Sequence, residues 1–204
     1  MTRGFAPLLG IVLLMGIGAL AWGTEGFRIV TSEGARRLAI ERRAPAVPDV
    51  PLVDQDGNPF SLRDYRGRTV LVEFIYTRCP SLCGALGDDF RRLLTLARSA
   101  PSQSKVDFLS ISFDRKNDDP EALRLYGERY GATPPRWRVA VPADGSGLAA
   151  LLRTFGVVAI PDGMGGFVHN GAIYLVDARG RLARILDPGS PPRLVREALR
   201  ELGP

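Results

Sequence analysis

The stretch YTRCPSLCG, residues 76–84, holds both cysteines of the chain and joins two different sequence patterns. Before it, residues 69–76 form a short apolar run rich in β-branched and aromatic residues, which is typical of a buried strand. After it, apolar side chains recur at three- and four-residue steps, as on one face of a helix: Leu82, Leu86, Phe90, Leu93 and Ala97. The stretch therefore predicts a strand-to-helix corner that carries two thiols.

The spacing of the cysteines favours reactive chemistry. Cys79 and Cys83 are four residues apart, which puts both sulfurs on one side of a first helical turn. Cys79 suits the N-cap and Pro80 the first helical position, where free amides and the helix dipole favour thiolates. A structural disulfide is the alternative, but a bridge around so small a loop stabilises a protein by only about 2 kcal/mol. We expect a reversible dithiol or a metal site.

Strands and helices alternate along the rest of the chain. A hairpin turning at Asp56 and Gly57 precedes the cysteine corner. The elements expected after the corner are a buried strand (105–113), a helix capped by Asp119, a strand (137–141), a helix (146–155), a hairpin (172–186) and a final helix from Ser190. This order predicts an α/β, thioredoxin-like fold, with a central mixed sheet flanked by helices and an N-terminal β-hairpin.

His169 is the only histidine and directly precedes the expected last hairpin. A lone histidine is most often structural. In a thioredoxin-like sheet, however, the loop before this hairpin lies against the cysteine corner. Two thiolates and an imidazole form a soft set of three ligands that suits copper, with zinc as the main competitor.

The segment around His169, residues 160–171, is rich in glycine and shows neither an apolar period nor a strand pattern. We expect it to be mobile without metal and ordered when His169 binds a metal. Its Met164 carries a soft sulfur, but the expected role of this side chain is a hydrophobic plug.

Four acidic residues near the corner need an interpretation. Glu73 lies inside the buried strand, where it forms a structural ion pair or acts as a base that tunes thiol protonation. Asp114 follows a strand end and is interpreted as a turn or cap residue. Asp118 and Asp119 are interpreted as caps. None of them is placed among the metal ligands.

The N-terminal region has a separate pattern. Residues 4–24 carry no charge, and a helix of that length, at about 1.5 Å per residue, spans a bilayer core. We expect residues 1–24 to be a membrane anchor, with a cleaved signal peptide as the alternative, residues 25–46 a tether and residues 47–204 the exported domain. The net charge of +5 comes from scattered basic residues without interleaved aromatics, so nucleic-acid binding has little support.

Three segments together resemble the Sco/SenC family: YTRCPSLCGAL from residue 76, residues 112–120, and residues 168–177. Members of this family are membrane-anchored, thioredoxin-like copper proteins that help assemble the binuclear copper site of cytochrome c oxidase. The resemblance implies that Cys79, Cys83 and His169 are ligands of Cu(I) or Cu(II). The sequence departs from the family pattern at two positions. Gly84 stands where many members have a second proline, and Arg115 replaces a proline.

The resemblance also implies partners, and the expected N-terminal anchor implies a location. The expected partners are the copper-bearing subunit II of cytochrome c oxidase and another copper chaperone, with the chain itself a monomer. The expected location is the inner membrane, with a single N-terminal span and the domain facing the periplasm. Two functions remain open: a copper-binding assembly factor, and a thiol-disulfide oxidoreductase in which Cys79 attacks and Cys83 resolves. His169 distinguishes them, because disulfide exchange does not need it.

Overall fold

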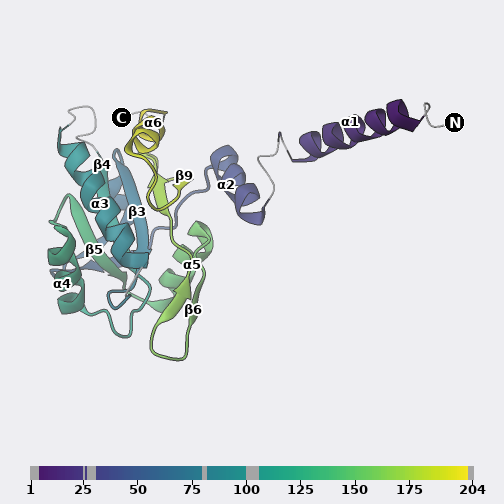
Figure 1. Ribbon diagram of the computed structural model, residues 1–204. Coiled ribbons are helices and arrows are strands. Elements are labelled where there is room, and N and C mark those ends of the chain that lie inside the picture. The colour runs from purple at the N-terminus through teal and green to yellow at the C-terminus, as the bar shows by residue number, and fades with distance from the viewer. Residues whose placement is uncertain (1–4, 25, 27–30, 80–81, 100–105, 202–204) are drawn as a thin grey trace. The chain divides into compact units, whose positions relative to one another are not determined.

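The computed structural model describes residues 5–24, 26, 31–79, 82–99 and 106–201. The chain divides into two compact units, residues 1–43 and residues 44–204, and each is described by itself (Figure 1). The first unit contains two helices, α1 (Phe5–Gly23) and α2 (Ser32–Arg43). The second contains all the strands and the cysteine corner.

The predicted membrane anchor over residues 1–24 is wrong, and so is the inner-membrane, periplasm-facing location derived from it. Among the residues that the structure describes, no helix is both long enough and apolar enough to cross a membrane. Helix α1 has 19 residues. At about 1.5 Å per residue it is slightly shorter than the roughly 30 Å core of a bilayer.

Helix α2 lies where the sequence predicted a tether without regular structure. Its Glu33 accepts hydrogen bonds from Arg36 (2.7 Å) and Arg37 (2.9 Å), three and four residues further along the helix. These guanidinium groups lower the pKa of Glu33 to about 2. The helix was missed because such ion pairs, and not a clear apolar stripe, support it.

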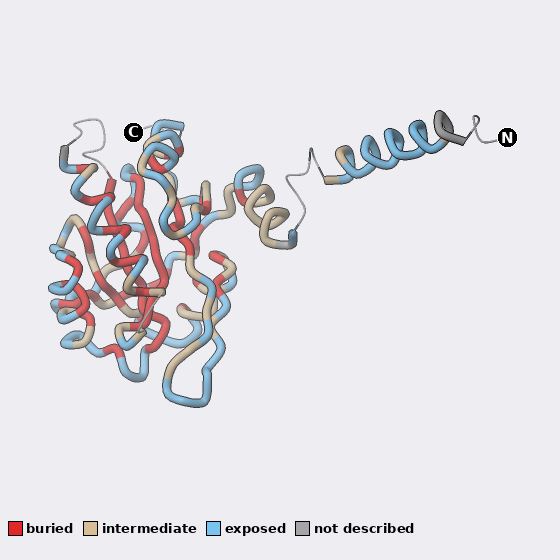
Figure 2. The backbone as a smooth tube through the Cα atoms, viewed as in Figure 1, coloured by how far each residue is buried: buried red, intermediate tan, exposed pale blue. Residues whose placement is uncertain are grey.

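The second unit is built on a seven-stranded mixed sheet with the order β2-β1-β5-β4-β3-β8-β9. The strands are β1 (Pro51–Asp54), β2 (Pro59–Ser61), β3 (Thr69–Ile75), β4 (Val106–Ser112), β5 (Trp137–Pro142), β8 (Ile173–Val176) and β9 (Leu182–Leu186). The central strands β3, β4 and β5 are parallel, and the flanking pairs are antiparallel. Every residue of β3 and β4 is buried, as Figure 2 shows in red. The predicted α/β class, mixed sheet and N-terminal hairpin are confirmed.

Helices cover this sheet, as predicted. They are η1 (Leu62–Tyr65), α3 (Leu82–Ser99), α4 (Pro120–Tyr130), α5 (Gly145–Phe155) and α6 (Pro192–Glu201). Four of the five residues of the apolar stripe predicted for α3 are buried, with Leu86 and Phe90 fully inaccessible to solvent, and Leu82 is half-buried. Asp119 caps α4 as predicted, since its side chain accepts the N–H of Ala122 at 2.9 Å.

Residues 159–169 form a two-stranded ribbon, although residues 160–171 show no strand pattern in the sequence, and their mobility without metal stays a prediction. Strands β6 (Ala159–Pro161) and β7 (Phe167–His169) pair antiparallel, with Ala159 opposite His169. The turn between them is held by Asp162, whose carboxylate accepts the N–H groups of Met164 (2.8 Å) and Gly166 (2.9 Å). Strands of three residues are too short to produce a visible alternation in the sequence, which is why they were missed. We refer to β6, β7 and their turn as the β6–β7 hairpin.

Candidate metal centre

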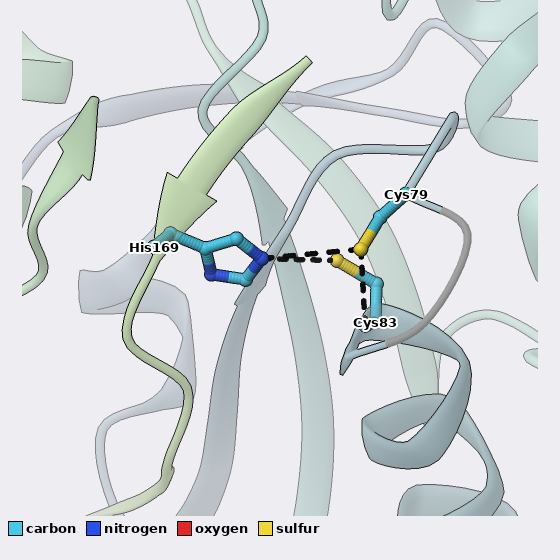
Figure 3. A group of neighbouring side chains, drawn as sticks. All are labelled: Cys79, Cys83 and His169. Carbon is cyan, nitrogen blue, oxygen red and sulfur yellow. Dashed lines mark hydrogen bonds between the residues drawn. The ribbon is translucent and has the colours of Figure 1, made fainter. Parts of the chain in front are cut away.

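The structure brings together all three predicted ligand residues. Cys79 follows β3, Cys83 lies in the first turn of α3, and His169 is the last residue of β7 (Figure 3). His169 Nε2 lies 3.6 Å from Cys83 Sγ and 4.0 Å from Cys79 Sγ. The two sulfurs and one nitrogen all lie within 4.8 Å of one another. Three donor atoms therefore converge on one point beyond the carboxyl ends of the central parallel strands.

The backbone of α3 contacts the first sulfur directly. The N–H of Cys83 donates to Cys79 Sγ at 3.4 Å, so a free amide of the first turn points at that sulfur, as the spacing predicted. Helix α3 begins at Leu82, and Cys79 therefore lies before it, bent back by a turn in which its N–H donates to the Tyr76 carbonyl. The predicted helical position of Pro80 lies outside the described residues.

The two thiols differ in their surroundings. Neither forms a disulfide, but Cys79 is partly exposed while Cys83 is only 1% exposed. Burial raises the pKa of the Cys83 thiol well above its usual range, against our expectation that both thiolates are favoured. Here desolvation outweighs the helix amides. A metal cation that binds Cys83 replaces the proton on its sulfur, and the displaced proton passes to the solvent.

A hydrogen bond and aromatic packing together orient the imidazole of His169. Its Nδ1 lies 3.1 Å from the carbonyl oxygen of Asn170, and a proton on Nδ1 donated there leaves the Nε2 lone pair facing the sulfurs. The ring packs against Tyr76 and Phe113, with centroid distances of 5.8 and 5.1 Å. Hydrogen bond and packing together hold the ring ready to accept a metal ion.

Gly171 lets the chain after His169 pass close to the cysteine helix. A Cβ at this position would lie 2.9 Å from a methyl carbon of Leu82, the first residue of α3. Contacts this short are essentially never seen, so the Leu82 side chain would have to move to make room for a larger residue. The glycine thus contributes to the close approach of His169 and the thiols.

Asp118 supports the corner in a way that the sequence interpretation missed. It is 1% exposed and does not cap α4. Its carboxylate accepts three hydrogen bonds, from the Thr77 N–H (2.9 Å), the Thr77 hydroxyl (2.7 Å) and the Ser112 hydroxyl (2.5 Å). Because Thr77 is two residues before Cys79, this network fixes the turn that carries the first thiol.

Arg78 is a second residue that the sequence did not single out. Its guanidinium donates to Asp114 at 2.9 Å and to the carbonyl oxygen of Gly165 at 3.0 Å. The Asp114 carbonyl also accepts the N–H of Asn117, which agrees with the predicted turn role. Arg78 therefore links the residue next to Cys79 with the turn of the β6–β7 hairpin.

Glu73 is fully buried behind the site, and the ion pair considered for it is not formed. In the described part of the chain its partners are hydroxyl groups, those of Ser110 (2.5 Å) and Tyr126 (3.4 Å). The Tyr126 hydroxyl is also 3.2 Å from the carbonyl oxygen of Cys83, so a polar chain runs from Glu73 to the cysteine helix. Burial raises the pKa of Glu73 to about 8.

Replacing this carboxyl should change how stability depends on pH. The pKa of Glu73 is higher in the folded than in the unfolded protein. Its contribution to the free energy of unfolding is therefore complete below the unfolded pKa and is lost as pH rises toward 8. We expect the free energy of unfolding of the wild type to fall by roughly 2–3 kcal/mol between pH 5.5 and 8 through this group, and Glu73→Gln to remove that fall.

Urea unfolding of the reduced protein across this pH range measures the effect. Glu128→Gln, a substitution on the exposed face of α4, is the matched control and should keep the wild-type slope. An unchanged slope in Glu73→Gln would show that Glu73 is ionised in the folded state throughout this range.

An open cavity of about 520 Å³ separates the cysteine corner from the β6–β7 hairpin. Cys79 and His169 line it together with Met164. Met164 is 88% exposed, so its predicted role as a hydrophobic plug is wrong. The short turn between β6 and β7 holds this side chain out in solvent instead of against the core.

Comparison with known proteins adds a family relationship to this geometry. A family model described as SCO1/SenC matches residues 40–203. The SCO1 protein homolog of Bacillus subtilis (strain 168) is 25% identical over 134 residues, which cover 64% of this chain and 68% of that protein.

Solved structures share the fold. Bradyrhizobium japonicum ScoI with copper bound is 23% identical, with a TM-score of 0.60 over 77% of this chain and 97% of that one. BsSco, a member of the Sco family of cytochrome c oxidase assembly proteins in which a disulfide switch was identified, is 24% identical, with a TM-score of 0.64 over 78% and 93% of the two chains. At these identities, the likeness establishes a common fold with the Sco proteins.

Proposed function

This chain belongs to the SCO1/SenC family, and from that premise we propose that it holds copper through Cys79, Cys83 and His169 and helps to load the copper site of cytochrome c oxidase. The convergence of two thiols and one imidazole within 4.8 Å supports this proposal most directly. The copper-bound structure of a relative with the same fold, and the assembly role of the Sco family, point the same way.

The donor set suits copper better than its main competitor. Thiolates and an imidazole are soft or borderline ligands, which copper prefers. Structural zinc sites almost always have four protein ligands. In the described part of the chain, no further histidine, cysteine or acidic side chain joins this group of three. A three-ligand site also leaves the metal accessible to an incoming ligand, as a protein that hands its metal on requires.

The surroundings of each ligand suggest an order of exchange. Cys83 is buried and Cys79 is partly exposed, while His169 belongs to a ribbon separate from the seven-stranded sheet. A ligand from the acceptor, the copper-bearing subunit of the oxidase in this proposal, displaces His169 first because a neutral imidazole holds copper more weakly than a thiolate does. The copper then remains on two thiolates, a weaker site from which the acceptor removes it.

A second function is favoured by the reduced state of the two neighbouring cysteines, neither of which forms a disulfide. In a thiol-disulfide exchange, the Cys79 thiolate attacks a disulfide of the acceptor protein and releases one acceptor thiol. The Cys83 thiolate then attacks Cys79 of the mixed disulfide, which releases the second acceptor thiol and leaves a Cys79–Cys83 disulfide. The exposure of Cys79 and the burial of Cys83 agree with these two roles.

The redox state of the thiols should decide whether copper binds. We expect the reduced protein to bind one Cu(I) per chain, and the protein with a Cys79–Cys83 disulfide to bind at least about 100-fold more weakly, because a disulfide offers no thiolate to the metal. Competition against a chromophoric Cu(I) chelator, with thiol trapping and mass spectrometry to verify each state, measures both affinities. Equal affinities in the two states would refute the proposed site.

A further inference from the structure

Met164 occupies an unusual position for a large apolar side chain. It is 88% exposed, and it lines the 520 Å³ cavity into which Cys79 and His169 also face. The cavity is the open side of the metal centre, because Cys79 and His169 line it whereas Cys83 does not and is only 1% exposed. A copper ion arriving from solvent through this cavity therefore passes Met164 and Cys79 before it reaches Cys83.

The turn holds Met164 at this rim. The Asp162 carboxylate accepts the Met164 N–H, and the neighbouring residues Gly163 and Gly165 have left-handed φ angles of +76° and +89°. Arg78 donates to the Gly165 carbonyl and so ties the turn to the residue beside Cys79. The backbone of Met164 is thus fixed relative to the first thiol, while its side chain, with three rotatable bonds, can reach into the cavity.

A thioether has the chemistry of a transient ligand for Cu(I). It is soft, as Cu(I) requires, but it is neutral, so it holds the ion more weakly than a thiolate does. It also has no proton to lose before it binds, unlike the buried thiol of Cys83. A methionine at the entrance can therefore bind Cu(I) at once and release it to stronger ligands further in.

We propose that Met164 is the entry and exit ligand of this copper site: its thioether binds Cu(I) in the cavity and exchanges it with Cys79, and through Cys79 with Cys83 and His169. The step is an exchange of ligands in which the copper keeps its oxidation state, and each cysteine proton that the metal displaces passes to the solvent. The inference rests on the proposed copper function.

Rates of copper transfer test this role. Met164→Leu keeps the size and apolar character of the side chain and removes only the sulfur. Cu(I) is supplied by, and returned to, a small chromophoric chelator in a stopped-flow instrument, and we expect uptake and release each to slow about tenfold. This is the low end of the roughly 10- to 100-fold effects that follow when a group supporting a metal site is removed. The equilibrium affinity should stay within twofold of the wild type, because a ligand used only along the path changes both rates equally.

Met15→Leu, which removes a thioether from α1, is the control and should transfer copper at the wild-type rate. Wild-type rates in Met164→Leu would overturn the inference and leave the copper site itself intact. An affinity loss above tenfold would also overturn it, since Met164 would then be a permanent ligand. A wild-type protein that binds no copper in the equilibrium titration would refute the proposed function, and the inference with it. Because copper is exchanged with a small chelator, a contribution of Met164 to docking with another protein does not affect the measured rates.

Discussion

The double variant Cys79→Ser/Cys83→Ser is expected to lose all stoichiometric copper binding. Serine keeps the shape of cysteine, but its hydroxyl is a hard, neutral donor that cannot replace a thiolate toward Cu(I). The remaining imidazole of His169 would then be a single ligand. Since no other cysteine exists in the chain, no further thiolate can take over. Titration with Cu(I) against a competing chelator, and with Cu(II) for the sulfur-to-copper absorption band, measures the loss.

His169→Ala should give an intermediate result. If metal sites supply on the order of 10 kcal/mol through their ligands, one ligand of three contributes about 3 kcal/mol, or a factor of roughly 100 in affinity. The rate of disulfide exchange should not change, so this variant separates the two proposed functions.

Met15→Leu is the control for the double cysteine variant, because it removes a sulfur away from the site. One copper still bound tightly by the double serine variant would contradict the proposed ligands.

The central strands β3 and β4 could be predicted because both are buried along their whole length. Apolar residues predominate in both strands, although each also contains polar residues. Helix α3 was equally clear, because it buries one face only. The β6–β7 hairpin was missed because its short strands are held by the Asp162 turn and by the packing of Phe167 against Tyr76 and Phe113. The aromatic contacts join residues that are far apart in the sequence.

The candidate ligands could be predicted from residue type and spacing, whereas their supports could not. Cys79 and Cys83 carry a local signal, and His169 is unique in the chain. Arg78 acts through partners 36 and 87 residues away, and Asp118 is bonded to Thr77 across 41 residues, so no local pattern identifies these roles. The raised pKa of Cys83 has the same origin, because the apolar surroundings that bury it are assembled only by the fold.

Asp118→Ala is expected to destabilise the protein by about 3–5 kcal/mol and to weaken copper binding. The substitution leaves the Thr77 N–H and the Ser112 hydroxyl without their acceptor, and each buried polar group left unpaired costs about 1–3 kcal/mol. The Ser112 side chain is completely buried, so water cannot easily take the place of the carboxylate. Thr77 is then free to shift, and with it the turn that places Cys79 beside His169.

Asp119→Ala is the matched control, because it removes an aspartate from the next position in the chain. Asp119 is exposed and accepts one N–H at the start of α4, so its loss should cost only about 1 kcal/mol. Urea unfolding of the reduced proteins compares the two variants, and Cu(I) titration under conditions where both remain folded compares their sites. Because only Asp118 is bonded to the segment before Cys79, only Asp118→Ala should lower copper affinity. Equal effects of the two substitutions on stability and on copper binding would mean that the Asp118 network does not position the thiol.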